Sequence, residues 1–274
     1  MSPIVSICIP TFNGERFLRQ TIESVLNQSL DNIEVIISDH GSTDRTIEII
    51  REFELRDSRI KWHRCLNRRN VEDNWNSAIE VATGKYLKLV CQDDVILPSS
   101  VLQQVQVLES NSEISFCFSP RDVIGPSGKV VLKSHGLKIE SCVYDFQSNI
   151  RQLVRSGTNI FGEPCAVLIR RTCLINVGPF TGRYLIDLNM WIRLWEVGPA
   201  YFLKECSSQF RVSASSWTSA LQGSQALEFK DMLNKLEIRY ADIISKSDLK
   251  KGYRRARLLE FARAIMIRLA EVRQ

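Results

Sequence analysis

The sequence LKLVCQDDVILP, residues 87–98, carries most of the information about the fold. It starts as an apolar strand, runs into two adjacent carboxylates, Asp93 and Asp94, and closes at Pro98. Neighbouring carboxylates repel each other, and a bound divalent cation relieves that repulsion. Open α/β sheets bind their ligands just beyond the carboxyl ends of their strands. The segment therefore predicts a metal-assisted site at one edge of a parallel sheet.

Strand and helix patterns alternate on both sides of this segment. Short apolar runs predict strands at residues 4–9, 33–38, 60–63, 85–90 and 114–118. Between these runs, apolar residues recur at helical spacing. We expect Ser42 to cap one of the helices and Gly84 to end another in the left-handed conformation. The alternation predicts the α/β class, with a mostly parallel, Rossmann-like sheet and helices on both of its faces.

The second half of the chain has a less regular pattern. Gly125–Gly128 predicts a turn between antiparallel strands, and residues 163–169 predict a further strand. Apolar spacing predicts helices at residues 146–154 and 185–195. This half therefore adds antiparallel pieces and helices to the regular sheet of the first half.

The end of the chain has two long helical patterns within residues 220–272, with a break expected at 246–249. Nothing in these patterns continues the strand–helix alternation. We therefore divide the chain into an α/β domain at residues 1–215 and a C-terminal helical extension at 216–274.

Composition places the chain among soluble globular proteins. Of 274 residues, 44% are hydrophobic and 24% charged, which is enough apolar material for a sizeable core. No apolar run approaches the roughly 18 residues that span a bilayer, and the first ten residues lack a basic leader region. The eight cysteines include no Cys-x-x-Cys pair, so we expect free buried thiols. A cytoplasmic location is expected.

The net charge of +5 is unevenly placed. Residues 246–274 contain nine Lys or Arg and three Asp or Glu, so the rest of the chain is close to neutral. A nucleic-acid partner is therefore not expected, because the body lacks a basic surface.

Three predicted strands end in polar residues. The first ends in Pro10-Thr11-Phe12-Asn13, the second in Asp39, and the fourth in Asp93 and Asp94. Parallel strands of one sheet end on the same side, so these groups should meet at one edge. Polar residues at the ends of three strands indicate a binding site more specifically than any one of these segments alone.

Several of these segments resemble the family 2 glycosyltransferases over about residues 4–212. The similar segments are VSICIPTFN at 5–13, SVLNQS at 24–29, EVIISDHGSTDRT at 34–46, NSAIEVATGKYL at 76–87 and the Asp93-Asp94 pair. The resemblance implies a GT-A fold. It also implies transfer of a sugar from a nucleotide-diphosphate donor, with inversion at the anomeric carbon, to a glycan or lipid-linked acceptor.

The resemblance also implies roles for individual residues. Thr11 and Asp39 would hold the base and ribose of the donor, with the backbone at Pro10 also touching the base. Asp93 would bind Mn²⁺ or Mg²⁺ on the diphosphate. Asp187, in IDLNMWIRL at 186–194, falls on the catalytic base. This division of labour fits inverting transfer, in which the cation stabilises the leaving group and a base deprotonates the acceptor.

Three further donor-binding residues are expected. Asn13 closes the first strand, Arg69 lies in the loop after the third, and Arg211 falls near the diphosphate in the family pattern. A solvated polar loop is an equal alternative for Arg69.

Two positions depart from the family pattern. His40 and Cys91 stand where the family usually has Asp. We expect weaker metal dependence, because Cys91 removes one acidic group while Asp93 is kept. A catalytically degenerate module that only binds nucleotide sugar is the alternative. A Rossmann dehydrogenase is disfavoured, because no Gly-x-Gly-x-x-Gly follows the first strand.

Structural interpretations also exist for these residues. Asp39 could form a turn before Gly41, and Asp93, Asp94 or Asp187 could simply favour a helix N-terminus. Trp75, Trp191 and Trp195 have the spacing of core residues. Trp217, in a loop of small residues, is either a loop residue or part of an acceptor-site lid.

The tail has an apolar stripe flanked by arginines. Its members are Leu258, Ala262, Ile265, Leu269 and Val272. Such a helix can pack on the body, on a second subunit of a homo-oligomer, or on the anionic inner face of a membrane.

Overall fold

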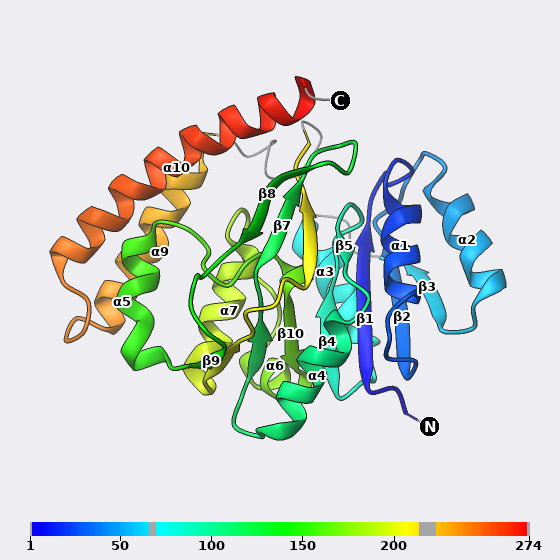
Figure 1. Cartoon of the computed structure of the whole chain (residues 1–274), viewed down its shortest axis with the longest axis horizontal. Helices are drawn as coiled ribbons and strands as arrows, with labels where there is room; N and C mark the ends of the chain where they lie inside the picture. Colours follow the sequence, from blue (N-terminus) through cyan, green and yellow to red (C-terminus); the bar gives the residue numbers. More distant parts are fainter. Residues whose placement is uncertain (1, 66–69, 214–222, 273–274) are drawn as a thin grey trace.

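The computed structural model describes residues 2–65, 70–213 and 223–272 (Figure 1). Its central feature is an eight-stranded sheet in the order β3-β2-β1-β4-β10-β6-β11-β9. In chain order these strands are β1 Val5–Thr11, β2 Ile33–Asp39, β3 Ile60–Arg64, β4 Tyr86–Leu89, β6 Phe116–Phe118, β9 Cys142–Tyr144, β10 Val167–Arg170 and β11 Ala200–Phe202.

The sheet is mostly parallel, as the sequence predicts. β1 pairs in parallel with β2 and β4, β2 with β3, and β6 with β11. β10 lies antiparallel between β4 and β6, and β9 lies antiparallel at the far edge. The second half of the chain thus extends the sheet with inserted antiparallel strands.

A smaller sheet adjoins the end of β4. It has the order β5-β12-β7-β8, with β5 at Val95–Ile96, β7 at Arg121–Ile124, β8 at Val130–His135 and β12 at Ser208–Arg211. The expected turn at Gly125–Gly128 joins the antiparallel strands β7 and β8. Because β5 pairs with β12, the smaller sheet brings residues near 210 beside the turn that follows β4.

Helices cover both faces of the main sheet, and the alternation of side chains explains why. Val5, Ile7 and Ile9 of β1 pack on one side, while Cys8 packs on the other. Helices α1 Leu18–Leu26, α2 Thr46–Arg56 and α4 Ser100–Ser110 fill the first side. The second side takes α3 Val71–Glu80, α5 Phe146–Ser156, α6 Arg171–Val177, α7 Ile186–Val197, α9 Gln225–Arg239 and α10 Lys246–Val272.

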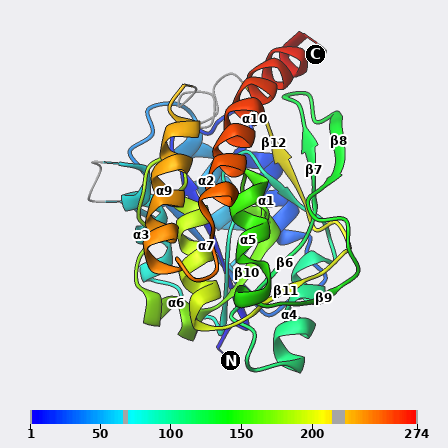
Figure 2. The same cartoon turned by 90° about the vertical axis from the view of Figure 1, so that its left-hand side faces the viewer.

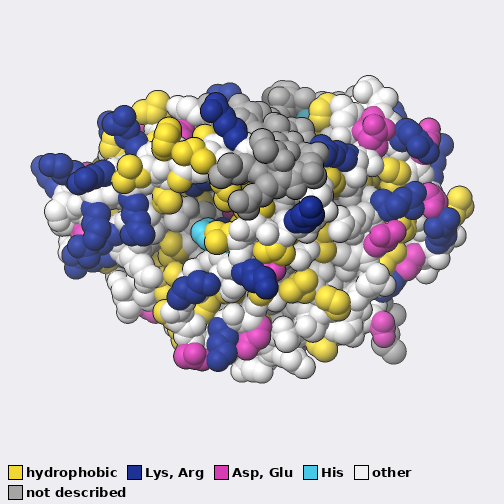
Figure 3. Space-filling view, turned by 45° about the horizontal axis from the view of Figure 1, so that its top comes forward, with side chains coloured by type: hydrophobic (Ala, Val, Ile, Leu, Met, Phe, Trp, Pro, Cys, Tyr) yellow, Lys and Arg dark blue, Asp and Glu magenta, His cyan; other side chains and the backbone are white. Residues whose placement is uncertain are grey.

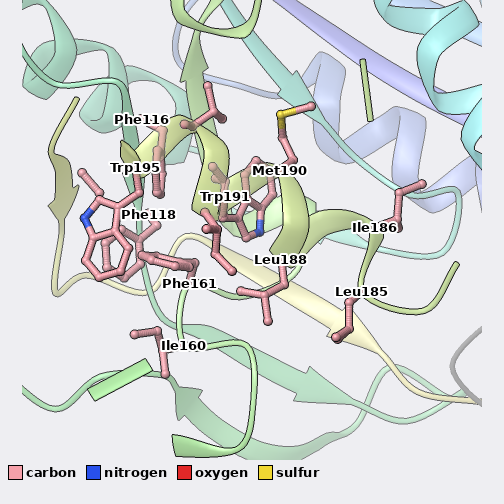
Figure 4. Packing of buried hydrophobic residues seen from close by; sticks show 14 of the residues in the cluster. Phe116, Phe118, Ile160, Phe161, Leu185, Ile186, Leu188, Met190, Trp191 and Trp195 are labelled. Atoms are coloured by element: carbon pink, nitrogen blue, oxygen red, sulfur yellow. The ribbon is translucent and has the colours of Figure 1, made fainter. Parts of the chain in front are cut away.

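An aromatic cluster fills the second core (Figure 4). Trp191 and Trp195 of α7 pack against Phe116, Phe118 and Phe161 and are fully buried. The prediction that these tryptophans belong to the core is confirmed. Truncating either to alanine should cost about 3–5 kcal/mol. The cluster therefore holds α7, which carries Asp187 at its first turn, firmly against the sheet.

Two helix-end predictions are wrong. Ser42 does not cap α2, which starts at Thr46; its Oγ instead accepts a hydrogen bond from the backbone N of Asn13 at 2.9 Å. Gly84 does not end α3 in the left-handed conformation, because the helix stops at Val81. A Cβ at Gly84 would lie 2.6 Å from the backbone N of Ser6, so the residue allows close approach to β1.

Two further boundaries differ from the sequence prediction. Residues 163–169 are not a single strand, because a short 3₁₀ turn at Pro164–Ala166 precedes β10. The break in the tail lies before residue 246, and residues 246–249 begin α10 instead of interrupting it. Asp248 is buried there and pairs with Arg151 and Arg155 of α5. The charge pairs of Asp248 thus fix the start of α10 to the body.

The C-terminal helices lie together on one end of the molecule. Figure 2 shows α10 crossing α5 and running beside α9. Gly252 permits the contact with α5, since a Cβ there would lie 2.1 Å from the carbonyl oxygen of Val154. Ala256 and Ile267 of α10 are buried, whereas Leu258 and Ile265 of the predicted apolar stripe are exposed. Up to residue 268, α10 therefore packs on the body through residues such as Ala256 and Ile267, and Leu258 and Ile265 of the stripe stay exposed.

Candidate active site

A cavity of about 310 Å³ opens where β1 and β4 end. Its walls come from Pro10 and Thr11 of β1, from α3, from the turn after β4 and from the start of α7. Asp93 and Asp187 both line it, although they are far apart in the sequence. The polar groups at the ends of β1 and β4 therefore meet here as expected, with α7 as an additional wall, whereas Asp39 at the end of β2 does not line the cavity.

The β1 wall is fixed by side chains from neighbouring elements. The amide of Gln92 pairs twice with the backbone of Phe12, as acceptor from its N at 2.8 Å and donor to its O at 2.9 Å. Nδ2 of Asn74, on α3, donates to the carbonyl oxygen of Thr11 at 3.1 Å. These bonds hold the end of β1 in one position beside the cavity.

Two polar atoms on this wall lack partners within the described residues. Oγ1 of Thr11 and Oδ1 of Asn74 are buried, yet neither makes a hydrogen bond there. An unpaired buried polar atom costs about 1–3 kcal/mol. Both residues line the cavity, so a polar ligand could supply the missing bonds.

The turn after β4 presents the acidic pair. Asp94 is buried and its Oδ1 accepts a hydrogen bond from the backbone N of Arg211 at 3.0 Å, so it ties the turn to β12. Burial raises the pKa of Asp93 to about 6 against the attraction of Arg211. Burial and the charge of Asp93 also raise the pKa of Asp94. Both carboxyls are therefore harder to ionise than usual. A cation bound nearby would favour their charged forms.

Arg211 lines the cavity, but its guanidinium is bonded to the protein. Nε donates to the carbonyl oxygen of Asp93 at 2.8 Å, Nη1 to that of Gly125 at 3.0 Å, and Nη2 to Oε1 of Gln20 at 2.6 Å. These bonds fix the backbone of Asp93. The contact of Arg211 with a donor diphosphate stays a prediction.

The side chains of the cavity wall would bind a divalent cation only together with oxygen atoms of a bound substrate. Among residues 2–65, 70–213 and 223–272, no three His, Cys, Asp or Glu side chains gather as a metal site. Mg²⁺ typically takes one or two carboxylates and completes its shell with substrate phosphates and water. Asp93, in the cavity wall, offers such a carboxylate. Burial raises the pKa of the Cys91 thiol, so this residue enters the wall uncharged.

Asp187 is held by two hydrogen bonds at the start of α7. Oδ1 accepts from the backbone N of Leu188 at 2.7 Å, and Oδ2 accepts from Nδ2 of Asn159 at 2.9 Å. Asn159 is itself fixed, because its Oδ1 accepts from the backbone of Phe161 and Gly162. The carboxylate is therefore oriented before any ligand arrives.

Burial, followed by the negative charge of Glu163, raises the pKa of Asp187 to about 7. Glu163 stays ionised, because the charge and hydrogen bonds of Arg121 outweigh burial and lower its pKa. Nη2 of Arg121 donates to Oε1 of Glu163 at 3.0 Å, and Nε donates to Oε2. A carboxylate with a pKa near neutrality is suited to act as a general base.

The remaining predicted residues lie elsewhere. Asn13 is not in the cavity wall; its Oδ1 accepts from the backbone N of Thr43 at 2.9 Å. Asp39 is buried outside the wall and accepts from the backbone of Gly41 and Ser42, which is the turn-forming alternative. Neighbouring His40 does line the cavity. The donor-binding roles of Asn13 and Asp39 stay predictions.

Arg69 and Trp217 fall outside the described residues. Trp75 is mostly buried against Phe180 and also touches the cavity, so it is a core residue at the rim of the site.

The residues of the site that sequence reasoning missed include Asn74, Gln92, Asn159 and Glu163. Gln92 had a signal, because it precedes the acidic pair directly. The others had none, since each depends on a contact between segments distant in sequence. Glu163 and Arg121, for example, are 42 positions apart.

The sequence model of Glycosyl transferase family 2 matches residues 6–178. This match covers more than half of the chain and includes the ends of β1, β2 and β4. The chain belongs to glycosyltransferase family 2. The expected enzyme class is thereby confirmed, and Asp93 lies within the matched region whereas Asp187 lies beyond it.

Several relatives match most of this family 2 chain. A glycosyltransferase of Rickettsia prowazekii (strain Madrid E) is 28% identical over 243 residues, covering 84% of this chain and 70% of that protein. TuaG of Bacillus subtilis (strain 168), named as a teichuronic acid biosynthesis glycosyltransferase, is 28% identical over 224 residues. That match covers 80% of this chain and 84% of TuaG.

Solved structures share the fold at low identity. Residues 1–349 of S. aureus TarS in complex with UDP-GlcNAc superpose with a TM-score of 0.71 at 14% identity, covering 92% of this chain and 72% of that one. The mannosyltransferase PcManGT from Pyrobaculum calidifontis, in complex with GDP-Man and Mn²⁺, gives 0.64 at 14% identity, with coverages of 99% and 74%. The expected α/β class with a mostly parallel sheet, matching these GT-A neighbours, is confirmed.

Proposed function

We propose that this family 2 enzyme transfers a sugar from a nucleotide-diphosphate donor to an acceptor hydroxyl, with inversion at the anomeric carbon. The observation that carries the proposal is that Asp93 and Asp187 face one cavity from different walls. A donor diphosphate beside Asp93 would direct its sugar toward Asp187. Inverting displacement needs the leaving group and the base on opposite sides of the anomeric carbon.

Asp187 is the proposed general base. It takes the proton of the acceptor hydroxyl while the acceptor oxygen bonds to the anomeric carbon. The bond from that carbon to the diphosphate oxygen breaks, and the diphosphate leaves with the electron pair. The hydrogen bonds from Asn159 and Leu188 keep the carboxylate aimed during this step. Its pKa of about 7 matches proton abstraction near neutral pH.

Asp93 is the proposed protein ligand of the divalent cation, Mn²⁺ or Mg²⁺. When bound there with the donor phosphates, the cation supplies positive charge that stabilises the leaving diphosphate. The complex of PcManGT with GDP-Man and Mn²⁺ supports this proposal by its shared fold.

The nucleotide would lie against the β1 wall. Oγ1 of Thr11 and Oδ1 of Asn74 are available there for hydrogen bonds to its polar edge. The fold shared with TarS, whose complex contains UDP-GlcNAc, supports a nucleotide sugar as the donor. His40 and Cys91, which depart from the family pattern, also line the wall and would influence which donor is accepted.

A thermal-shift screen tests the donor class. We expect one or more of UDP-, GDP- and dTDP-sugars to raise the melting temperature with Mn²⁺ present, because a ligand that binds the native state stabilises it by mass action. The stabilising donor should then be hydrolysed slowly without an acceptor. Stabilisation without hydrolysis or transfer would identify a nucleotide-sugar-binding module. No stabilisation by any member of the screen would contradict the proposal.

The acceptor is proposed to be a glycan or a lipid-linked sugar, reached at the inner face of a membrane. In residues 2–65, 70–213 and 223–272, no helix is long and apolar enough to cross a bilayer. Leu258, Phe261 and Ile265 of α10 are nevertheless exposed at helical spacing, at 62%, 70% and 44%. In Figure 3, which brings this end forward, hydrophobic side chains gather at the upper left with Lys and Arg around them. Such a surface suits peripheral contact with anionic lipid.

Sedimentation with phosphatidylglycerol vesicles tests this contact. The double variant Leu258→Ser/Phe261→Ser should pellet less than the parent protein while keeping its activity on a soluble acceptor. Phosphatidylcholine vesicles serve as the uncharged control. Equal sedimentation of parent and variant would rule out this surface.

A further inference from the structure

We propose that a second cavity, enclosed by α7, α9 and α10, is the subsite for the terminal sugar ring of the acceptor. This inference rests on the proposed function, because it takes Asp187 as the base. The cavity measures about 110 Å³, which suits one sugar ring better than a longer chain. It would make the C-terminal helical extension part of the substrate-binding machinery.

The two cavities meet at the proposed base. Both are lined by Glu163, Tyr184, Asp187 and Phe210. Thr11 and Asp93 line only the larger one. In an inverting transfer the acceptor approaches the anomeric carbon from the side opposite the diphosphate. The smaller cavity shares Asp187 with the larger one but is not lined by Asp93 or Asp94, so it offers an acceptor space that reaches the base and not the acidic pair.

The lining of the smaller cavity combines apolar and polar groups. Phe229 of α9 and Met266 and Ile267 of α10 supply an apolar side. Gln225 and Arg263 supply polar groups from the same two helices. A pyranose ring presents both C–H patches and hydroxyls, so mixed lining of this kind matches its surface.

The polar side is held in place by contacts between elements. Nε of Arg263 donates to Oε1 of Gln225 at 3.0 Å, and its guanidinium carbon lies 6.0 Å from the centre of the Tyr184 ring. The backbone N of Tyr184 donates to Oε2 of Glu228 at 2.9 Å. The backbone N of Gln225 donates to Oε1 of Glu260 at 3.1 Å. Helices α9 and α10 are thereby tied to the segment that leads into Asp187, so the cavity walls keep a fixed relation to the base.

Helix α10 has one face toward the cavity and another toward solvent. Ala256, Arg263 and Ile267 line the cavity, whereas Leu258 and Phe261 are exposed on the other side of the helix. Variants of the cavity face can therefore be tested with soluble acceptors, independently of the proposed membrane contact.

Two further hollows offer no comparable position. One, between α3 and α6, is lined by residues such as Asn76 and Phe180; another lies beside α4 and Tyr201. Neither includes Asp93 or Asp187. Of these hollows, the α7–α9–α10 cavity is the one that reaches Asp187 without being lined by Asp93.

The experiment uses the full chain with the donor found by thermal shift and a panel of p-nitrophenyl glycosides. The panel contains glucoside, galactoside, mannoside, N-acetylglucosaminide, N-acetylgalactosaminide and glucuronide, and the transfer product is quantified by chromatography. Arg263→Ala removes a polar contact, and Met266→Trp fills the cavity. Lys251→Ala, an exposed cation outside the cavity on the same helix, is the matched control.

Arg263→Ala should raise the acceptor KM roughly 10-fold, the effect of losing one good polar contact. Met266→Trp should raise it at least as much, because the indole occupies the space of the sugar ring. Donor Kd and donor hydrolysis by water should stay within about twofold of the parent, since water needs no sugar subsite. Lys251→Ala should change none of these quantities. Melting temperatures are measured for all variants, and Met266→Trp keeps the test informative if Arg263→Ala unfolds.

Several outcomes would overturn the inference. An unchanged acceptor KM in both variants would do so, as would equal losses in donor hydrolysis and transfer. Hydrolysis of the donor by the parent protein without transfer to any glycoside in the panel would also reject a sugar-ring subsite. Failure of donor binding and hydrolysis in the parent would instead reject the proposed function, so the two failures are distinguishable.

Discussion

The two walls of the main cavity differ in how their polar groups are satisfied. On the β1 wall, Thr11 and Asn74 keep buried atoms without partners in the described structure. On the α7 wall, both carboxylate oxygens of Asp187 accept hydrogen bonds, and Asn159 is fixed in turn. One wall is arranged to gain bonds from a ligand, whereas the other is arranged to stay still. This difference is what a bound donor and an immobile base require.

The sharpest test of the difference is Asp187→Asn. The amide cannot accept the acceptor proton, so transfer should fall about 10³-fold, within the range for loss of a general base. Donor Kd should change less than twofold, because the β1 wall is untouched. Rapid-quench kinetics and calorimetric donor titration separate the two quantities. Equal loss of binding and transfer would mean that Asp187 holds the donor.

Asp93→Asn is expected to have the next largest effect, with transfer falling about 10²-fold. The amide is a weaker ligand for a hard cation, so Mn²⁺ should no longer tighten donor binding. Donor titrations with and without Mn²⁺ measure this coupling. Asp94→Asn is the comparison, since Oδ1 of Asp94 is bonded to the backbone of Arg211. Unchanged Mn²⁺ dependence in Asp93→Asn would remove Asp93 as the cation ligand.

Asn74→Ala should weaken donor binding about fivefold, as expected for one lost hydrogen bond. Asn76 is the matched control, because it lies on the same helix and both of its amide atoms bond the backbone of Phe180. Asn76→Ala should lower the melting temperature yet leave donor Kd unchanged. If the two variants weaken donor binding equally, the β1 wall has no special role.

The smallest effect is expected for Glu163→Gln and appears in the pH profile. Asp187 acts deprotonated, so kcat should rise as the pH passes its pKa of about 7. Removing the negative charge of Glu163 lowers that pKa, so the rise should move to lower pH. Arg121, Asn159 and the backbone N of Leu188 also face this region and favour the charged form. An unmoved or upward-shifted profile would contradict the assigned influence of Glu163.

The double variant Arg121→Met/Glu163→Gln is the control for that prediction. Arg121 and Glu163 act on the pKa of Asp187 in opposite directions, so removing both should shift the profile less than removing Glu163 alone. It also avoids leaving Arg121 buried without its partner, which would destabilise the fold.

Local pattern predicted the first half of the fold well. Strands β1, β2 and β4 are buried on both faces, so their apolar runs were visible in the sequence. The position of Asp93 followed directly, because it comes just after β4. Gly84 was misjudged because its role depends on a close approach to Ser6, which no local pattern reveals.

The other wall of the site was predicted only through family resemblance. Asp187 has no local feature beyond an acid in the first turn of a helix. Its environment comes from Asn159 and from the Arg121–Glu163 pair. These contacts join segments that lie 28 and 42 positions apart in the sequence. The engagement of Arg211 with the backbone of Asp93 was likewise invisible, since it depends on β12 pairing beside β5.

A crystal structure with the stabilising nucleotide sugar and Mn²⁺ would test the two-wall arrangement most directly. We expect the nucleotide against Thr11 and Asn74, the diphosphate and cation beside Asp93, and the anomeric carbon turned toward Asp187. A nucleotide bound away from the end of β1, or a sugar pointing away from Asp187, would contradict the arrangement.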